Sequence, residues 1–269
     1  MAKTAFHKMH GLGNDFIIFD GRENPLALDE GKVRQLADRH GGIGCDQLIV
    51  LHASDKADVR MQIFNHDGGE VEACGNASRC VVTLLDQDVS IETDGGVISG
   101  ELTGDAARVN MGVPRFDWQE IPLDYAMDTA NMPVSWGDLR SPAAVNVGNP
   151  HVIFFVGDGG AVDLGTIGPD IEHDPLFPER INVNVAHIKG GEIYLRVWER
   201  GAGLTKACGT GACATAVAAI SRKLVSSPVK VHLPGGMLQV EWDGANAPIH
   251  MAGPATYVFS GEIDLDTLT

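Results

Sequence analysis

Apolar and polar residues alternate along this chain in short segments, which is typical of a protein with many β-strands and few helices. Apolar runs at 16–20 and 45–51 predict strands, the second of them buried, and a strand with alternating apolar residues is expected at 59–65. Further strands are expected at 89–109 with turns between them, at 152–156, 182–185 and 192–199, in a hairpin at 229–242, and at 257–261.

Three segments have the period of a helix instead. Val33, Leu36 and Ala37 share one face of an amphipathic helix expected at 29–40. Apolar helices are expected at 77–86 and 212–224, each directly after a loop that contains a cysteine. Between the two halves, prolines at positions 114, 122, 133 and 142 lie among mixed polar residues and indicate a passage between two lobes.

The two cysteine loops are copies of one pattern. Cys74-Gly75-Asn76 and Cys208-Gly209-Thr210 begin 134 residues apart in a chain of 269. Three more pairs recur at offsets of 134 or 135: Gly13-Asn14 with Gly148-Asn149, Gln47 with Asn182, and Asn65 with Glu199. A constant offset over several positions predicts an internal duplication with two similar lobes. The alternative is that Asn and Gly merely form turns at these places.

A cysteine at a helix N-terminus is suited to acid–base chemistry. The helix dipole and the first N–H groups lower the pKa of a thiol, and the same N–H groups bind carboxylates. Two such loops facing one substrate would place a sulfur on each side of its α-carbon, one as thiolate and one as thiol. The amides of Asn14, Gln47, Asn65, Asn149 and Asn182 would suit a polar zwitterion.

Two residues near the second loop have open roles. Arg200 could clamp a carboxylate with two hydrogen bonds, or it could be a solvated charge at a strand end. His151 could orient or deprotonate a thiol, or it could be a hydrogen-bonded histidine at the start of a strand.

Other uses of the cysteines fit less well. Cys80 and Cys213 follow the loop cysteines at wider spacing than structural zinc pairs and on other helix faces, so they and Cys45 are expected to be core residues. A redox disulfide between Cys74 and Cys208 has no Cys-x-x-Cys motif behind it. A thiol acyl-transfer enzyme would pair one cysteine with His66 or His151 and leave the second cysteine unexplained.

Composition narrows the class of protein. The net charge of −16 argues against nucleic acid as a partner. The first residues lack the apolar core of a signal peptide, and no run approaches the roughly 18 apolar residues of a membrane span. The five cysteines leave one without a disulfide partner, so a cytoplasmic protein with reduced thiols is expected. No nucleotide-binding glycine motif and no lysine in a pyridoxal-phosphate context occurs, which favours an enzyme without cofactor or metal.

With these motifs the chain closely resembles the diaminopimelate epimerase family. The resemblance covers essentially its whole length. The matching stretches are His10–Phe16, Gly42–Gln47, Phe64–Gly68, Cys74–Asn76 with Arg79-Cys80, Gly148–His151, Phe177–Asn182, Glu199–Gly203, Ala207–Ala212 and Leu233–Gly236.

The resemblance implies an α+β fold with two pseudo-symmetric lobes, each a mixed or antiparallel sheet wrapped round a central helix. The N-terminal lobe would comprise 1–115 and the last strand at about 257–269, the C-terminal lobe 116–256, with the active site in the cleft between them. The implied activity interconverts LL- and meso-diaminopimelate without a cofactor, as a step in lysine and peptidoglycan precursor synthesis, in a homodimer.

The resemblance also assigns residues. Cys74 and Cys208 would be the catalytic acid and base, with His151 and Glu199 close enough to tune them. The substrate would be held by Asn14, Gln47, Asn65, Gly75, Asn76, Asn149, Asn182, Glu199, Arg200, Gly209 and Thr210. The alternatives are a racemase or isomerase of the same fold acting on another amino acid, and a non-enzymatic binding or metal module.

One residue departs from the family pattern. The first loop of the family usually reads Cys-Gly-Asn-Gly, and this chain has Ala77 in the last position. A positive φ there would strain an alanine by roughly 1 kcal/mol, whereas alanine is favourable inside a helical turn. We expect the helical alternative, because Ala77 opens the apolar helix.

Overall fold

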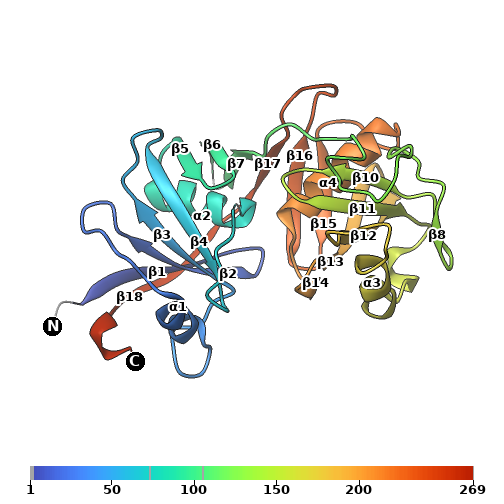
Figure 1. Ribbon diagram of the computed structural model, residues 1–269. Coiled ribbons are helices and arrows are strands. Elements are labelled where there is room, and N and C mark those ends of the chain that lie inside the picture. Colours follow the sequence, from blue (N-terminus) through green and yellow to red (C-terminus); the bar gives the residue numbers. More distant parts are fainter. Residues whose placement is uncertain (1–2, 73, 105, 269) are drawn as a thin grey trace. The chain divides into compact units, whose positions relative to one another are not determined.

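The computed structural model describes residues 3–72, 74–104 and 106–268. They form two compact units (Figure 1). Unit 1 runs to Val109 and resumes at Gly253, and unit 2 comprises Asn110–Ala252. Unit 2 is therefore an insertion between two segments of unit 1.

Unit 1 is a mixed sheet with two helices. Its strands lie in the order β7-β6-β5-β4-β3-β2-β1-β18, and β1 and β18 run side by side (Figure 1). The strands are β1 (Thr4–Gly11), β2 (Asn14–Asp20), β3 (Gln47–His52), β4 (Val59–Asn65), β5 (Val89–Thr93), β6 (Gly96–Thr103), β7 (Ala106–Asn110) and β18 (Thr256–Ile263), and the helices are α1 (Glu30–Ala37) and α2 (Gly75–Leu85). A 3₁₀ turn, η2 (Leu265–Thr267), follows β18.

Unit 2 repeats this plan in the order β10-β11-β12-β13-β15-β16-β17, with β14 paired to β13 outside the main order. Its strands are β10 (Ala143–Asn146), β11 (Pro150–Phe155), β12 (Asn182–Lys189), β13 (Glu192–Glu199), β14 (Gly203–Thr205), β15 (Val229–Leu233), β16 (Gly236–Glu241) and β17 (His250–Pro254). Its helices are α3 (Leu164–Glu172), α4 (Gly209–Ser221) and the 3₁₀ turn η1 (Gly159–Ala161), and β8 (Ser135–Trp136) and β9 (Leu139–Arg140) form a separate short hairpin.

The central strands of unit 1 are buried on both faces. Ile17, Phe19 and Val50 pack with α1 in one apolar cluster. The alternate residues Phe16 and Ile18 are equally buried and, by the alternation of a strand, face the other side of the sheet. Helix α2 packs against β1, β5, β6 and β18, so the sheet curls around it (Figure 1).

Unit 2 has the same layers. Phe154 and Val185 join an apolar cluster with Leu164 and Ile171 of α3. Helix α4 packs against β10, β11, β12, β13, β15 and β16, and it is buried on nearly every side. A helix that is apolar all round has to lie inside the protein, and the small side chains of α4 allow strands to approach from several directions. The α+β prediction, with each sheet wrapped round a central helix, is confirmed.

The predicted duplication recurs in the topology. In both units the first two strands are antiparallel, the second and third are parallel, and the third and fourth are antiparallel. Phe16 lies opposite Gln47 in unit 1, and His151 lies opposite Asn182 in unit 2, at the same sequence offset. Helices α1 and α3 begin 134 residues apart, each in the connection between the parallel strands.

Two segments differ from the sequence-based expectation. Helix α3 was not predicted, because Gly165, Gly168 and Pro169 give its sequence little helix propensity. The proline-containing segment after Met111 does not behave as a linker, because Ile121, Leu123 and Met132 belong to the core of unit 2. Each central helix also begins a few residues before its apolar run, at the glycine that follows the cysteine.

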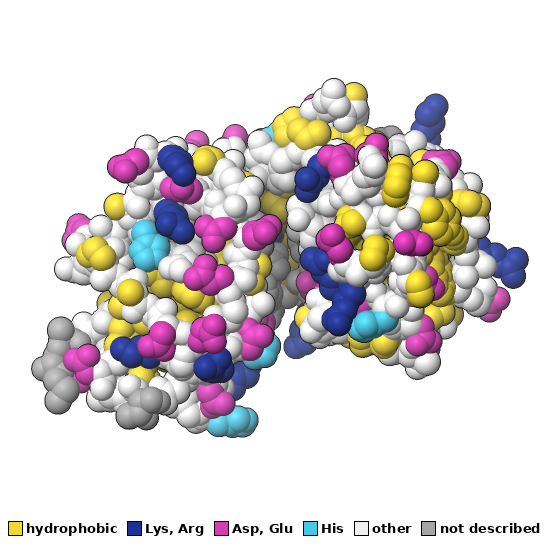
Figure 2. Space-filling model, in the orientation of Figure 1, with side chains coloured by type: hydrophobic (Ala, Val, Ile, Leu, Met, Phe, Trp, Pro, Cys, Tyr) yellow, Lys and Arg dark blue, Asp and Glu magenta, His cyan; other side chains and the backbone are white. Residues whose placement is uncertain are grey.

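Acidic and basic side chains are interspersed on the face of each unit that Figure 2 shows, with the acidic ones in excess over the whole chain. Within residues 3–72, 74–104 and 106–268, every helix falls short of the length and hydropathy needed to cross a bilayer.

Candidate active site

Cys74 is the N-cap residue of α2, the central helix of unit 1. Its backbone is extended (φ −147°, ψ 110°), and its carbonyl oxygen accepts 2.9 Å hydrogen bonds from the N–H and the hydroxyl of Ser78. The side chain is partly exposed, whereas Gly75 and Asn76 behind it are buried. The first N–H groups of a helix have no acceptor within the helix, so the thiol lies at a site that favours negative charge.

Three amide side chains predicted to bind substrate come from neighbouring strands of unit 1. Asn14 begins β2, Gln47 begins β3 and Asn65 ends β4. The parallel pairing of β2 with β3 and the register of Gln47 opposite Asn65 place them along one edge of the sheet. Gln47 donates from Nε2 to Asn65 Oδ1 at 3.0 Å, while Gln47 Oε1 is buried and has no partner among the described residues. This edge of unit 1 thus presents a buried acceptor that has no donor among the described residues.

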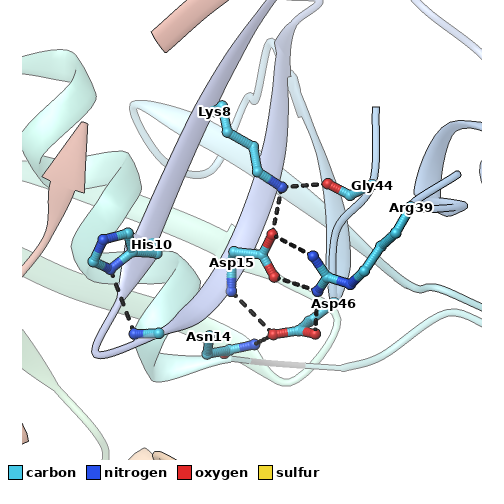
Figure 3. A network of polar contacts seen from close by, with 8 residues as sticks. Lys8, His10, Asn14, Asp15, Arg39, Gly44 and Asp46 are labelled. Atoms are coloured by element: carbon cyan, nitrogen blue, oxygen red, sulfur yellow. Dashed lines mark hydrogen bonds and ion pairs between the residues drawn. The ribbon is translucent and has the colours of Figure 1, made fainter. Parts of the chain in front are cut away.

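A charged network supports Asn14 (Figure 3). Asn14 Nδ2 donates to Asp46 Oδ2 at 3.1 Å, and Arg39 holds the other oxygen of Asp46 at 2.8 Å. Arg39 also pairs with Asp15, which is reached from the other side by Lys8 at 2.5 Å. Burial opposes ionisation of Asp15, but the hydrogen bonds from Arg39 and Lys8 prevail and lower the pKa of Asp15 to about 2.

Cys208 is the N-cap of α4 in unit 2, in the same extended conformation (φ −114°, ψ 108°). Its Sγ accepts from Gly211 N–H at 3.3 Å and lies 3.5 Å from the hydroxyl of Thr210. Burial and the negative charge of Glu199 raise the pKa of this thiol well above its usual value, against the effect of the helix N-terminus. This environment favours the thiol form of Cys208 over the thiolate.

His151 is completely buried at the start of β11, where it supports an amide rather than a thiol. Its Nε2 lies 2.9 Å from Asn149 Oδ1, and its Nδ1 lies 3.3 Å from Asn184 Oδ1. Burial, reinforced by the charge of Arg200 and opposed by the hydrogen bond with Asn184, lowers the pKa of His151 to about 4. The imidazole is neutral near pH 7.

The start of β12 lies beside the end of β13. Asn182 is the first residue of β12, Glu199 is the last residue of β13, and Arg200 follows it. The buried Asn182 donates to Pro150 O at 2.8 Å and accepts from Arg200 N–H at 2.9 Å. The exposed Arg200 donates from Nη1 to Glu179 O at 3.0 Å, and Thr205 donates its hydroxyl to Glu199. Unit 2 thus brings Asn149, His151, Asn182, Glu199, Arg200, Cys208, Gly209 and Thr210 to one end of α4 and the strands around it.

Ala77 lies inside α2, fully buried and without a positive φ, as expected for a residue in a helical turn. Its counterpart Gly211 is more constrained. A Cβ at Gly211 would lie 3.1 Å from Val197 Cγ2 and 3.2 Å from Cys208 Sγ. The glycine therefore gives the second sulfur its room, and the first loop accommodates a methyl group at the same place.

The other cysteines are thiols in the core, as predicted. Cys45, Cys80 and Cys213 are buried, and burial raises the pKa of Cys45 and of Cys80 to about 12. In the part of the chain that the structure describes, no three His, Cys, Asp or Glu side chains are grouped so as to hold a metal ion.

Comparison with known proteins identifies the family. The diaminopimelate epimerase family model matches residues 6–116 and 143–258. A diaminopimelate epimerase of Erythrobacter litoralis is 61% identical over 97% of this chain and 98% of the relative. One of Zymomonas mobilis is 56% identical over 97% of each. The chain belongs to the diaminopimelate epimerase family.

Solved structures show that this family's two-unit fold is shared more widely. A phenazine biosynthesis protein of the PhzF family from Enterococcus faecalis superposes with a TM-score of 0.71 over 98% of this chain and 100% of that one, at 12% identity. A hydroxyproline epimerase from Agrobacterium vitis gives 0.68 over 98% and 91%, at 14% identity. At such identities the likeness concerns the fold alone.

The sequence of this member of the diaminopimelate epimerase family did not predict the residues that hydrogen-bond to the site residues from behind. Asn184 donates to Gly211 O at 3.2 Å and to Thr215 Oγ1 at 3.0 Å, and it faces His151. The alternation of Asn and Val at 182–185 was the available signal, because it places both asparagines on one face of β12. The hydrogen bond of Asp46 with Asn14 had no comparable local pattern in the sequence.

Proposed function

We propose that this protein is a cofactor-independent diaminopimelate epimerase, an isomerase that interconverts the LL and meso forms by two-thiol proton transfer. One observation carries the proposal. Cys74 and Cys208 are both N-caps of the central helices of two repeated units, at equivalent positions in the topology. Each unit can supply a sulfur and a helix N-terminus to a single substrate.

In the proposed reaction a thiolate removes the proton from the substrate α-carbon, and a thiol on the opposite face returns a proton to it. The electron pair released from the C–H bond spreads into the adjacent carboxylate, where the N–H groups of Gly75, Asn76, Gly209 and Thr210 stabilise the added charge. One cysteine starts as the thiolate base and the other as the thiol that donates; burial and the charge of Glu199, which raise the pKa of Cys208, favour its thiol form. The reverse reaction exchanges these states.

The polar side chains support a zwitterionic substrate. Gln47 Oε1 offers a buried acceptor to an ammonium group. Asn14 and Asn65 retain N–H groups beyond those in the bonds described above, and these suit a carboxylate. Arg200 and Glu199 add one charge of each sign in unit 2, with Asn149 and Asn182 beside them. His151 holds Asn149 in place in this scheme.

The test is isomerisation in deuterium oxide. Purified protein incubated with LL-diaminopimelate should form the meso isomer, and the inverted α-carbon should carry deuterium from solvent. Other amino acids assayed in parallel should be inert. If LL-diaminopimelate is not converted, the proposed activity is wrong. Conversion without solvent deuterium would contradict the two-thiol mechanism. Turnover of another amino acid would show that the substrate assignment is wrong.

We also propose a homodimer in the cytoplasm. Tyr257, Val258 and Phe259 are about half exposed on β18, the edge strand of unit 1, and an exposed apolar edge supports pairing with a second copy. Sedimentation of a species at the 28.6 kDa monomer mass would contradict the dimer.

The free thiols suit a reducing compartment such as the cytoplasm. Recovery of the protein outside the cytoplasmic fraction would contradict that location.

A further inference from the structure

Asn14 lies inside a chain of hydrogen bonds with a charged group at each end. At one end the fully buried Arg79 donates from Nη2 to Asn76 Oδ1 at 2.9 Å. Asn76 Nδ2 donates to Asn14 Oδ1 at 3.1 Å, and Asn14 Nδ2 donates to Asp46 Oδ2 at 3.1 Å. The chain thus runs from a guanidinium in α2 to a carboxylate just before β3.

The two ends fix the direction of every amide between them. A guanidinium only donates hydrogen bonds, and an ionised carboxylate only accepts them. Asn76 must therefore turn its oxygen to Arg79, and Asn14 must turn its nitrogen to Asp46. One N–H of Asn14 is then left for a ligand, so Asn14 meets the substrate as a donor.

Asp46 is itself held in place by charge (Figure 3). Arg39 binds its Oδ1 at 2.8 Å, which leaves Oδ2 for Asn14 and for Asp15 N–H, each at 3.1 Å. Arg39 is anchored in turn by Asp15, with its Nη2 2.7 Å from Oδ1. Lys8 neutralises Asp15 from the interior of the unit, where the Lys8 side chain is 11% exposed.

We propose that Asp46 is a positioning residue for the epimerase reaction, which orients the amide of Asn14 so that its remaining N–H faces the substrate. Arg39 acts through Asp46 by holding the carboxylate in that orientation. This inference rests on the proposed function and extends it to residues that do not themselves contact substrate.

The exchange Asp46→Asn tests this role because it creates a conflict between two donors. Arg39 would draw the amide oxygen of the new side chain and turn its NH₂ group toward Asn14. Since Asn14 would then lose its acceptor and its fixed direction, KM for LL-diaminopimelate should rise about tenfold, the usual effect of losing one hydrogen bond to a charged group. The value of kcat should stay within about twofold, because Cys74 and Cys208 are unchanged.

Removing the competing donor should restore binding. In the double variant Arg39→Met/Asp46→Asn the amide oxygen is free to accept from Asn14, so KM should return to within about threefold of the wild-type value. Arg39→Met alone should raise KM by no more than about threefold, because Asp46 loses the ion pair that holds it but still accepts from Asn14. This cycle separates positioning from a loss of stability, since a purely structural role predicts no rescue.

Asp94→Asn is the matched control. Asp94 pairs with Arg60 at 3.3 Å in the same unit, and its side chain is 46% exposed against 45% for Asp46. This control should leave KM and kcat unchanged. If Asp46→Asn keeps the wild-type KM, or if the folded double variant still has a tenfold raised KM, the proposal is overturned. If Asp46→Asn fails to fold, the KM of the folded double variant still tests the proposal. An inactive wild type would instead remove the proposed function, and this inference with it.

Discussion

The two units hold their cysteines in the same topological position, but they support the equivalent asparagines, Asn14 and Asn149, with side chains of different chemistry. Around Asn14 in unit 1 the supports are charged and partly exposed: Lys8, Asp15, Arg39 and Asp46, with Arg79 behind them. Around Asn149 in unit 2 they are neutral and buried: His151, Asn184 and Thr215. At the position equivalent to Asn184, unit 1 has Ile49.

The difference shows which part of a duplicated fold is constrained. The strand order, the parallel pair and the cysteine at the helix N-terminus recur in both units. The groups behind the amides are free to differ, because an ion pair and an amide network can each fix the orientation of an asparagine side chain. The following predictions test how far the two supports are equivalent.

The largest expected effect concerns the two sulfurs. Cys74→Ala and Cys208→Ala should each lower kcat for epimerisation by about 10³-fold or more, since each removes an obligatory acid or base. Cys80→Ala and Cys213→Ala are matched controls on the same helices, buried and outside the proposed chemistry. If either Cys74→Ala or Cys208→Ala keeps its turnover, that cysteine is not an obligatory acid or base and the two units do not contribute equally to catalysis.

A smaller effect should distinguish the neutral network. Asn184→Leu leaves His151, Thr215 and the carbonyl of Gly211 without their partner, so the free energy of unfolding should fall by about 3 kcal/mol. Ile49→Leu, at the equivalent position of unit 1, should cost less than about 1.5 kcal/mol. Urea unfolding measures both, and equal losses would mean that the amide network adds nothing to packing.

His151 in unit 2 and Asp15 in unit 1 should lose their contributions to the free energy of unfolding at different pH values. Both losses should be smallest near neutral pH. The pKa of His151 is lowered to about 4 from an ordinary 6.5, so its contribution to stability is complete above pH 6.5 and is lost as pH falls towards 4. The pKa of Asp15 is lowered to about 2 from an ordinary 3.8, so its contribution is lost only between pH 4 and 2. Unit 2 should therefore weaken first in acid.

Local probes can follow each unit during that titration. All four tryptophans of the chain, at positions 118, 136, 198 and 242, belong to unit 2, so tryptophan fluorescence reports on that unit. Hydrogen exchange of α2 reports on unit 1. His151→Gln should flatten the change between pH 6.5 and 4, and Asp15→Asn the change between pH 4 and 2. A simultaneous loss in both units would contradict the separation.

Much of this arrangement follows from local sequence. The alternation at Val59, Met61 and Ile63 gives β4 with the predicted bounds, and the equal offsets of the asparagines and cysteines predict the repeat. The supports could not be predicted in the same way. Lys8, Arg39 and Asp46 are ordinary surface residues in a sequence, and only the pairing of β1, β2 and β3 brings them together. Helix α3 escaped prediction because its contacts with β12 and β13 outweigh its poor helix propensity.

The order of the strands has a consequence for synthesis. All of unit 2 lies between β7 and β18, so a growing chain presents a complete, contiguous unit 2 before the strand that pairs with β1 has been made. Domains that emerge whole tend to fold as they appear. Unit 1 therefore begins first on the ribosome, but its sheet can be completed only after β18 has been made, because β18 pairs with β1.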